Sequence, residues 1–347
     1  MLTQYLNKLR SAQNLTEEEA SNTLCMIMNG KVDDLQIEQM LLALSDKGEH
    51  VDELVGFAKT MREHSVKAAL SCNLDRLLDT CGTGGDGGRT FNISTAVAFV
   101  AAAAGIPVAK HGNRAVSGKT GSIDVLEALG IEVDLEPIFF NEIFKQTNLV
   151  FLHAQLHHPA MRYVAPIRKK LQKRTIFNMI GPLTNPAGAS HQIIGVYREE
   201  LTEKVGVALQ RLGCRRGMVV HSQSGLDELS IDGENEITEI DGESLRSYRL
   251  APEDVGLARS PLQHISGGDA SENAEIIRNI FLGETGAKRD IVVLNAGAAL
   301  YIADKSRSVA EGVKQAEALL DSGDVYRVYE SYRQLAKMYS RVKGEAL

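Results

Sequence analysis

The sequence lacks the patterns that mark secreted, membrane-spanning and zinc-binding proteins. Its four cysteines are scattered over 347 residues without a C-x-x-C pair or a zinc-ligand spacing, which is typical of a reducing compartment. The N-terminal stretch "MLTQYLNKLRSAQNLTEEEA" has no apolar core of a signal peptide. The longest apolar run, "AVAFVAAAAGIPVA", is shorter than the roughly 18 residues of a membrane span. We therefore expect a cytoplasmic protein without a membrane partner.

An excess of positive charge is also absent. The chain has 38 lysines and arginines against 45 aspartates and glutamates, a net charge of −7. General attraction to nucleic acid or to an anionic membrane is therefore not indicated, and a bound anion must be met by local positive charge. The apolar fraction of 44% is ordinary for a globular protein, and the length allows one large domain or a large and a small one.

Residues 1–70 are predicted to be entirely helical. Thr16 and Glu19 form a capping-box pattern ahead of one apolar helix, and Asp34 is expected to cap the next. Residues 51–64 then place an apolar stripe on one helix face. Helices of this size cannot enclose a full core alone. We expect this segment to form a small domain that buries its apolar surface in a homodimer.

The pattern changes after residue 74, where apolar strand-like runs alternate with helical ones. This alternation predicts an α/β domain over residues 74–347 with a central, largely parallel sheet. Part of the segment 165–190 is expected to pack on the helical domain. The strand-like runs are "RLLDTC", "IPVAKH", "IEVDL", "LVFLHA", "QIIGVY", "GMVVHS" and "DIVVLNA".

The stretch "GTGGDGGRTFNIST" joins a predicted strand to an alanine-rich helix. Five of its first seven residues are glycine. At a strand-to-helix turn, free backbone N–H groups and the positive end of the helix dipole form an anion site. Asn92, Ser94 and Thr95 stand at the helix start as capping or ligand-facing residues. A bound phosphate therefore explains this loop better than a glycine-rich surface turn does.

Known phosphate motifs fit this loop only in part. A Walker A lysine is absent, whereas G-x-G-x-x-G fits from Gly82 to Gly87. That dinucleotide fingerprint needs an acidic residue at the end of the next strand, and here the strand ends in Lys110-His111. Lys110, Arg114 and Lys119 instead predict contacts to a second phosphate. A dinucleotide-dependent dehydrogenase remains an alternative on the glycine spacing alone.

Four long motifs in sequence order resemble the signatures of the anthranilate phosphoribosyltransferase family, and the resemblance covers essentially the whole chain. It implies the nucleoside-phosphorylase-like type of phosphoribosyltransferase fold and a homodimer joined through the helical domains. It also implies a Mg²⁺-dependent step of tryptophan biosynthesis, in which anthranilate and 5-phosphoribosyl 1-pyrophosphate give N-(5-phosphoribosyl)anthranilate and pyrophosphate. The motifs are "GTGGDGGRTFNIST", "KHGNRAVSGKTGSIDVLEALG", "HHPAMRYVAPIRKKLQKRTIFNMIGPLTNP" and "GLDELSI".

The same resemblance assigns the donor-binding residues. They shape the glycine loop, hold the phosphates and complete the pocket at the second loop. The set is Gly82, Thr83, Gly85, Asp86, Thr90, Asn92, Ser94, Thr95, Lys110, His111, Gly112, Asn113, Arg114, Ala115, Val116, Ser117, Gly118 and Ser122.

The acceptor and metal sites follow from the resemblance in the same way. Anthranilate would contact Gly82, Asn113 and Arg168, whose guanidinium suits a carboxylate, with His111 and Pro182 lining the slot. Magnesium takes oxygen ligands, and the ligands implied for it are Ser94, Asp227 and Glu228.

Some positions depart from the family pattern. His153-Ala154-Gln155 stands where the family usually has F-A-P, and Val116-Ser117-Gly118 stands where it often has V-S-S. The first departure is expected to affect the acceptor entrance and the second the stiffness of the loop. His153 and His157 have i, i+4 spacing, but they lack H-E-x-x-H or a third ligand, so a metal is not expected there.

Two further alternatives share the fold class. A pyrimidine nucleoside phosphorylase would have the same architecture and anion loop but would lack the Asp227-Glu228 pair. A non-catalytic nucleic-acid-binding paralogue would be expected to be basic and to have lost the glycine loop, whereas this chain is acidic and retains it.

Overall fold

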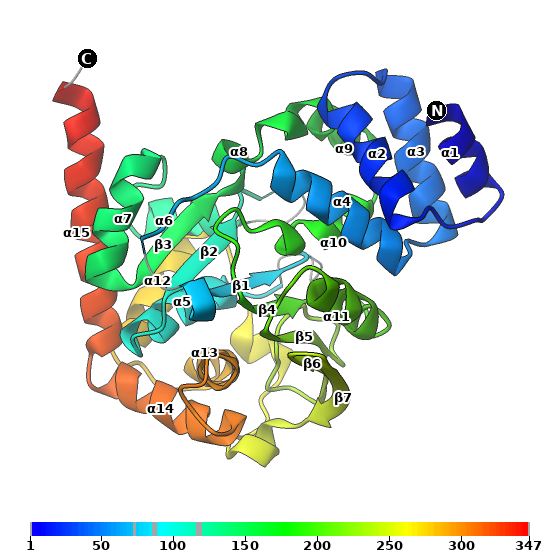
Figure 1. Cartoon of the computed structure of the whole chain (residues 1–347). Helices are drawn as coiled ribbons and strands as arrows, with labels where there is room; N and C mark the ends of the chain where they lie inside the picture. Colours follow the sequence, from blue (N-terminus) through cyan, green and yellow to red (C-terminus); the bar gives the residue numbers. More distant parts are fainter. Residues whose placement is uncertain (1, 72–73, 85–88, 116–119, 346–347) are drawn as a thin grey trace.

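The structure is a computed structural model that describes residues 2–71, 74–84, 89–115 and 120–345. Its first four helices form a bundle that lies to one side of a larger α/β body (Figure 1). These helices are α1 (Leu2–Arg10), α2 (Glu17–Met28), α3 (Asp34–Lys47) and α4 (Val51–Glu63).

Side-chain caps set where α2 and α3 begin. Thr16 Oγ1 accepts a hydrogen bond from Glu19 N at 3.2 Å, and Glu19 Oε2 accepts one from Thr16 N at 2.8 Å, which confirms the predicted capping box. The cap of α3 is Asp33, whose Oδ1 accepts from Gln36 N at 2.8 Å. The prediction of Asp34 was wrong by one residue because Asp34 already has its place in the helix.

A fully buried carboxylate, Glu53 on α4, ties the helices of this bundle together. Its Oε1 accepts from Leu15 N at 2.9 Å, and its Oε2 accepts from His50 N at 2.7 Å and Lys47 Nζ at 3.0 Å. Both carboxylate oxygens therefore have partners, as a buried charge requires.

The α/β body is built on a seven-stranded sheet with the order β3-β2-β1-β4-β5-β6-β7. The first five strands in that order are parallel, and β6 and β7 add an antiparallel edge, so the predicted largely parallel sheet is confirmed. The strands are β1 (Leu78–Gly82), β2 (Val108–Gly112), β3 (Leu149–His153), β4 (His191–Gly195), β5 (Arg216–Ser222), β6 (Asn235–Asp241) and β7 (Ser244–Leu250).

Helices cover the sheet, with α5 and α13 packed against each other and against its strands while α11 packs on β5, β6 and α4. The helices of the body are α5 (Ile93–Ala103), α6 (Ser122–Ala128), α7 (Pro137–Thr147), α8 (Ala154–His157), α9 (Ala165–Leu171), α10 (Ile176–Ile180), α11 (Leu201–Arg211), α12 (Ala270–Phe281), α13 (Ala287–Ile302), α14 (Val309–Asp321) and α15 (Asp324–Glu345).

Two predicted strands are wrong. Residues 131–135 are not a strand, although Ile131, Val133 and Leu135 alternate into the core. Residues 290–296 lie in α13, which is buried on nearly all sides. A short apolar run of this kind does not distinguish a buried strand from a buried helix.

The apolar interior has two clusters. One fills the α/β body, and the other joins α1–α4 to residues 164–183 and to parts of β4, β5 and α11. Phe57 of α4 and Phe177 of α10 meet edge to face at 6.1 Å between ring centroids. Segment 164–183 thus packs on the helical bundle, whereas the exact boundaries at residues 70 and 74 stay a prediction.

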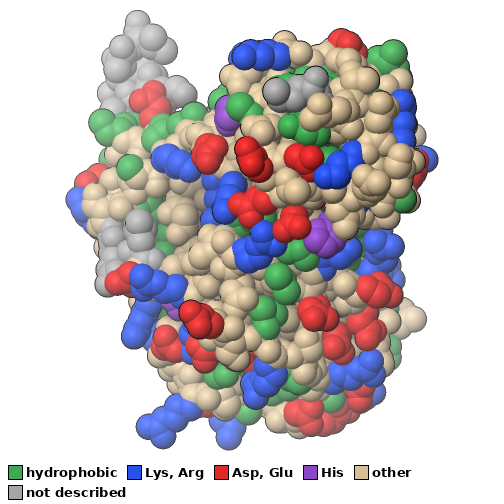
Figure 2. All heavy atoms as spheres, turned by 45° about the vertical axis from the view of Figure 1, so that its right-hand side comes forward, with side chains coloured by type: hydrophobic (Ala, Val, Ile, Leu, Met, Phe, Trp, Pro, Cys, Tyr) green, Lys and Arg blue, Asp and Glu red, His purple; other side chains and the backbone are tan. Residues whose placement is uncertain are grey.

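The surface carries charges of both signs. On the face shown in Figure 2, acidic and basic side chains are interspersed and hydrophobic side chains form small, scattered patches. Among the described helices, none has the length and apolar content needed to cross a membrane.

Replacing Glu53 by alanine should strongly destabilise the helical bundle, because Lys47 would remain buried without its carboxylate. We expect the free energy of unfolding to fall by about 3–5 kcal/mol in urea denaturation. The matched control is Glu63→Ala, an exposed position on the same helix, which should change it by less than about 0.5 kcal/mol. Equal effects of the two substitutions would contradict this account of Glu53.

Candidate functional site

The predicted site residues gather at the carboxyl ends of the parallel strands, where the strand order reverses on either side of β1. Open α/β sheets bind ligands at such a switch point. The segment at Asp227 crosses here. A Cβ atom at Gly82 would lie 2.6 Å from Asp227 Oδ2, and one at Gly195 would lie 1.6 Å from the Asp227 carbonyl oxygen. These two glycines are needed to make room for a carboxylate of the chain itself.

The glycine loop is attached to that carboxylate. Gly84 N donates a hydrogen bond to Asp227 Oδ2 at 2.7 Å, and Gly84 has a φ of +71° that favours glycine. Asp227 is only 7% exposed, and Glu228 follows it in the chain. Burial raises the pKa of the nearby Cys81 thiol, and the charges of Asp79 and Glu228 add to that effect. Two adjacent carboxylates therefore lie at the head of β1.

Lys110 provides the positive charge of this edge. It is 3% exposed on β2, and its Nζ donates to the carbonyl oxygen of Thr80 and to Ser94 Oγ, the latter at 3.1 Å. Ser94 stands in the first turn of α5. Within the described residues this ammonium forms no ion pair, so one of its three donors remains for a ligand.

Unsatisfied hydroxyl groups accompany the lysine. Thr83 Oγ1 and Thr95 Oγ1 are buried and, in the part of the chain that the structure describes, have no hydrogen-bond partner. Asn92, at the N-cap of α5, makes no capping bond and instead contacts Asn273 Nδ2 at 3.1 Å and the Thr120 carbonyl at 3.4 Å. Buried hydroxyls normally have partners, so these are candidate ligand contacts.

Asp124 of α6 holds the second loop in place. It accepts hydrogen bonds from Ala115 N at 2.9 Å and Gly121 N at 2.8 Å. Arg114 pairs with Glu127 at 2.6 Å and with Asp124 at 3.3 Å. The charge of Arg114, predicted to face the donor, is thus already balanced on α6, and its contact with a ligand stays a prediction.

Other predicted residues line the same edge. Ser122 Oγ donates to the Asn113 carbonyl at 3.3 Å, and a Cβ at Gly112 would lie 2.1 Å from that hydroxyl. Thr90 forms an antiparallel bridge with Ser266. Several predicted positions, and the basic Lys119, lie outside the described residues: Gly85, Asp86, Val116, Ser117 and Gly118.

Arg168 lies on α9, a different element from those that carry Lys110 and Ser94. Its guanidinium carbon lies 5.5 Å from the centroid of the Phe177 ring, and burial lowers its pKa. Among the described residues, the guanidinium group of Arg168 forms no hydrogen bond or ion pair, and only its backbone is bonded, to Val164 and Gln172. A partly buried guanidinium without a carboxylate partner suits a carboxylate brought by a ligand.

Three predicted or neighbouring histidines, His111, His157 and His158, are buried. The rings of His111 and His158 meet edge to face at 5.1 Å between centroids. Burial lowers the pKa of His158 to about 4 and that of His111 well below its ordinary value, and it also lowers the pKa of His157. All three rings are therefore neutral at pH 7.

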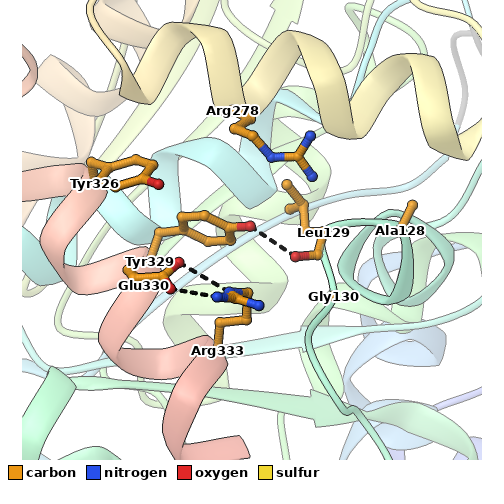
Figure 3. Close-up of a pocket in the computed structure, with 8 residues that line it drawn as sticks. All are labelled: Ala128, Leu129, Gly130, Arg278, Tyr326, Tyr329, Glu330 and Arg333. Atoms are coloured by element: carbon orange, nitrogen blue, oxygen red, sulfur yellow. Dashed lines mark hydrogen bonds and ion pairs between the residues drawn. The ribbon is translucent and has the colours of Figure 1, made fainter. Parts of the chain in front are cut away.

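The sequence-based reasoning missed two buried polar residues, Asp79 of β1 and Asn185. The available signal was an acidic residue inside the apolar run "RLLDTC". A separate surface pocket of about 290 Å³ lies between α6, α12 and α15 (Figure 3). Its Arg333 pairs with Glu330, and none of the predicted site residues lines it.

Comparison with known proteins gives near full-length matches. A model of the glycosyl transferase family, a/b domain, matches residues 74–326, and a model of its helical bundle domain matches residues 3–65. An anthranilate phosphoribosyltransferase of Brevibacillus brevis is 49% identical over 336 residues, covering 97% of this chain and 98% of the relative. One of Petrotoga mobilis is 45% identical over 340 residues, covering 98% of both.

Solved structures agree with the sequence matches. The crystal structure of anthranilate phosphoribosyltransferase from Thermus thermophilus has a TM-score of 0.90 and 43% identity, covering 96% of this chain and 99% of that one. The enzyme from Saccharomyces cerevisiae in complex with PRPP and Mg has a TM-score of 0.87 and 26% identity, covering 97% and 98%.

Replacing His158 by glutamine should reduce the loss of stability in acid. The folded pKa of about 4 lies below the ordinary value of about 6.5, so protons bind the unfolded chain more tightly. Stability from this residue is complete above pH 6.5 and is lost as the pH falls towards 4, by on the order of 3 kcal/mol.

Urea denaturation between pH 7 and 4.5 measures this effect as the difference between wild type and variant. Asp79, whose pKa is raised to about 6, acts in the opposite sense but is present in both proteins. Identical pH dependence in the two proteins would show that His158 does not titrate as its burial indicates.

Proposed function

Because the chain belongs to the anthranilate phosphoribosyltransferase family, we propose that it transfers the phosphoribosyl group of 5-phosphoribosyl 1-pyrophosphate to the amine of anthranilate. The products are N-(5-phosphoribosyl)anthranilate and pyrophosphate, in a step of tryptophan biosynthesis. The structural observation that most supports this proposal is the buried Lys110 ammonium at the switch point, which lacks an ion pair within the described residues.

The donor is held at the edge formed by β1, β2 and the start of α5. Lys110 and the first turn of α5, with Ser94 and Thr95, face its phosphates, and Thr83 supplies a further hydroxyl. The N–H groups of a helix start and an ammonium favour negative charge. The predicted donor contacts of Gly82, Asn92 and the second loop belong to the same edge.

The residues at this edge also fit Mg²⁺. Magnesium is bound by one or two carboxylates together with substrate phosphates and water, and Asp227, Glu228 and the Ser94 hydroxyl are oxygen donors of that kind. Asp227 is held over the glycine loop by Gly84 N. When bound, the ion would neutralise charge on the departing pyrophosphate.

Anthranilate is held at the opposite wall. Arg168 receives its carboxylate in a bidentate contact, and Asn113 and Gly82 contact the ring and the amine. His111 and Pro182 line the slot. Because His111 is neutral, it offers the ring a flat surface without a charge that competes with Arg168 for the carboxylate.

Catalysis then requires no protein nucleophile. Pyrophosphate leaves the anomeric carbon through a cation-like transition state, as in glycoside chemistry. Lys110 and the α5 N-terminus stabilise the charge that develops on the leaving group. The two walls hold the amine in line for attack, so that positioning supplies much of the rate.

The assembly is a cytoplasmic homodimer joined through the helical bundles. The resemblance to the family supports this arrangement. Light scattering at low micromolar concentration should give twice the mass of one chain. A stable monomer under these conditions would exclude the dimer.

Anthranilate fluorescence tests the proposed reaction directly. The signal should change with time only when the donor and Mg²⁺ are both present, and a chelator should stop the change. Inorganic phosphate with a pyrimidine nucleoside serves as the competing substrate pair. Turnover of that pair, with no consumption of anthranilate, would favour the nucleoside phosphorylase alternative.

Substitution of Arg168 by alanine should weaken anthranilate binding about 10- to 150-fold, because a charge-assisted bidentate contact worth about 1.5–3 kcal/mol is lost. Arg168→Lys should restore only part of this affinity, since an ammonium lacks the planar fork. Donor affinity should change little, because Lys110 is unaffected. Separate titrations of the two substrates measure both effects.

The matched control for this experiment is Lys169→Ala, which removes an exposed cation from the next position of α9. It should leave both affinities unchanged. If Arg168→Ala lowered donor and acceptor affinity equally, or neither, the assignment of Arg168 to the anthranilate carboxylate would be wrong.

A further inference from the structure

A buried carboxylate–amide pair links the donor strands to the loop that borders the acceptor slot. Asp79 is fully buried; its Oδ1 accepts from His111 N at 3.1 Å, and its Oδ2 accepts from Asn185 Nδ2 at 2.8 Å. Asn185 Nδ2 also donates to the Ala109 carbonyl at 2.8 Å, and its Oδ1 accepts from Ala187 N at 2.9 Å. The side-chain amide of Asn185 thus bonds to both donor strands and to its own loop.

The backbone carbonyl groups of the loop 181–186 accept hydrogen bonds from the loop itself, from β4, from α4 and from the linker that follows α4. Gly181 accepts from Thr184 Oγ1 at 2.8 Å, Pro182 from Gln192 Nε2 at 3.0 Å, Leu183 from Arg62 Nε at 2.7 Å, and Pro186 from Ala68 N at 3.2 Å.

The pair is joined to two residues that the proposed function assigns to the acceptor slot. Asp79 holds the backbone N–H of His111, whose ring meets that of His158 edge to face, and the loop 181–186 carries Pro182. The position of this loop is set at one point by Asn185, because its amide holds the loop against β1 and β2.

We propose that Asp79 and Asn185 form a positioning pair that fixes the acceptor slot relative to the donor strands. Neither residue contacts a substrate. The pair acts through the backbone of His111 and through the loop 181–186, and the inference rests on the proposed function of the site.

The two members of the pair differ in a way that makes the inference testable. Burial raises the pKa of Asp79 and the Lys110 charge lowers it, so Asp79 and Lys110 interact. Removing Asp79 would therefore disturb the donor side as well. Asn185 is uncharged, and its removal leaves that balance intact. A purely structural role of Asn185 would lower stability without separating the two substrates.

Asn185→Ala should therefore weaken anthranilate binding about 10- to 100-fold, because several buried hydrogen bonds that fix the loop are lost. Donor affinity should change by less than about 3-fold. The matched control is Thr147→Val, which removes a buried hydroxyl that bonds the Ile143 and Leu149 carbonyls on α7 and β3. It should lower the melting temperature and leave both affinities unchanged.

A charged variant of Asn185 gives a signature that loss of stability alone would not produce. Asn185→Asp places a second carboxylate beside Asp79, and the two can remain together only when they share a proton. The anthranilate affinity of this variant should therefore rise as the pH falls from 8 to 6, whereas that of Thr147→Val should not.

Fluorescence titration gives the anthranilate affinity and calorimetry gives the donor affinity, so neither measurement depends on turnover. Wild-type protein that binds both substrates without turnover would overturn the proposed reaction and still allow the pair to be tested. The pair is overturned if Asn185→Ala lowers both affinities equally or neither. It is also overturned if the anthranilate affinity of Asn185→Asp does not change between pH 8 and pH 6.

Discussion

The carboxylate of Asp227 lies where β1 and β4 diverge, and the site depends on the space that Gly82 and Gly195 leave for it. A side chain at either glycine would meet this segment at less than van der Waals distance. Gly84 N donates a hydrogen bond to this carboxylate, so a negative charge lies beside the loop. This is where the polyphosphate of the proposed donor would approach. In the proposed function, a phosphate can approach this carboxylate only with positive charge between the two anions. Lys110 and a magnesium ion would supply that charge.

The proposed site has a donor wall, formed by Lys110 and the glycine loop, and an acceptor wall that carries Arg168. These two walls rest on different apolar cores. Lys110 and the glycine loop rest on the core of the α/β body, whereas the segment that carries Arg168 packs through Ile167 and Phe177 on the helical bundle. The distance between the walls is therefore not fixed by either core alone. It is set where the cores meet, at the loop 181–186, whose carbonyls are bonded to β4, to α4 and to the linker that follows α4. A polar loop satisfied on all sides is stiffer than an apolar contact of the same size, because each bond has a preferred direction.

Local signals in the sequence were sufficient for much of the fold. The capping box at Thr16, the strand and helix on either side of the glycine loop, and the five parallel strands depend on residues close together in the chain, and they were predicted correctly. The anion-binding role of the glycine loop stays a prediction. The run 290–296 was misassigned because full burial removes the periodicity that separates a helix from a strand. The antiparallel strands β6 and β7 were missed. Room for Asp227 beside Gly82 could not be read from the sequence either, because 145 positions separate the two residues and only the tertiary fold brings them together.

The proposed function requires a chain with a net charge of −7 to bind two anionic substrates, so the pairing of its cations matters more than their number. Arg114 follows the donor strand and looks suited to a phosphate in the sequence, yet Glu127 and Asp124 balance its charge. Lys110 and Arg168 are the reverse case, since Lys110 is buried, Arg168 is partly buried, and neither forms an ion pair within the described residues. Holding a cation in this state costs free energy that an anionic ligand returns on binding. Selection between the two substrates then follows from shape: a compact ammonium at a helix start suits a phosphate, and a planar guanidinium suits a carboxylate on a flat ring.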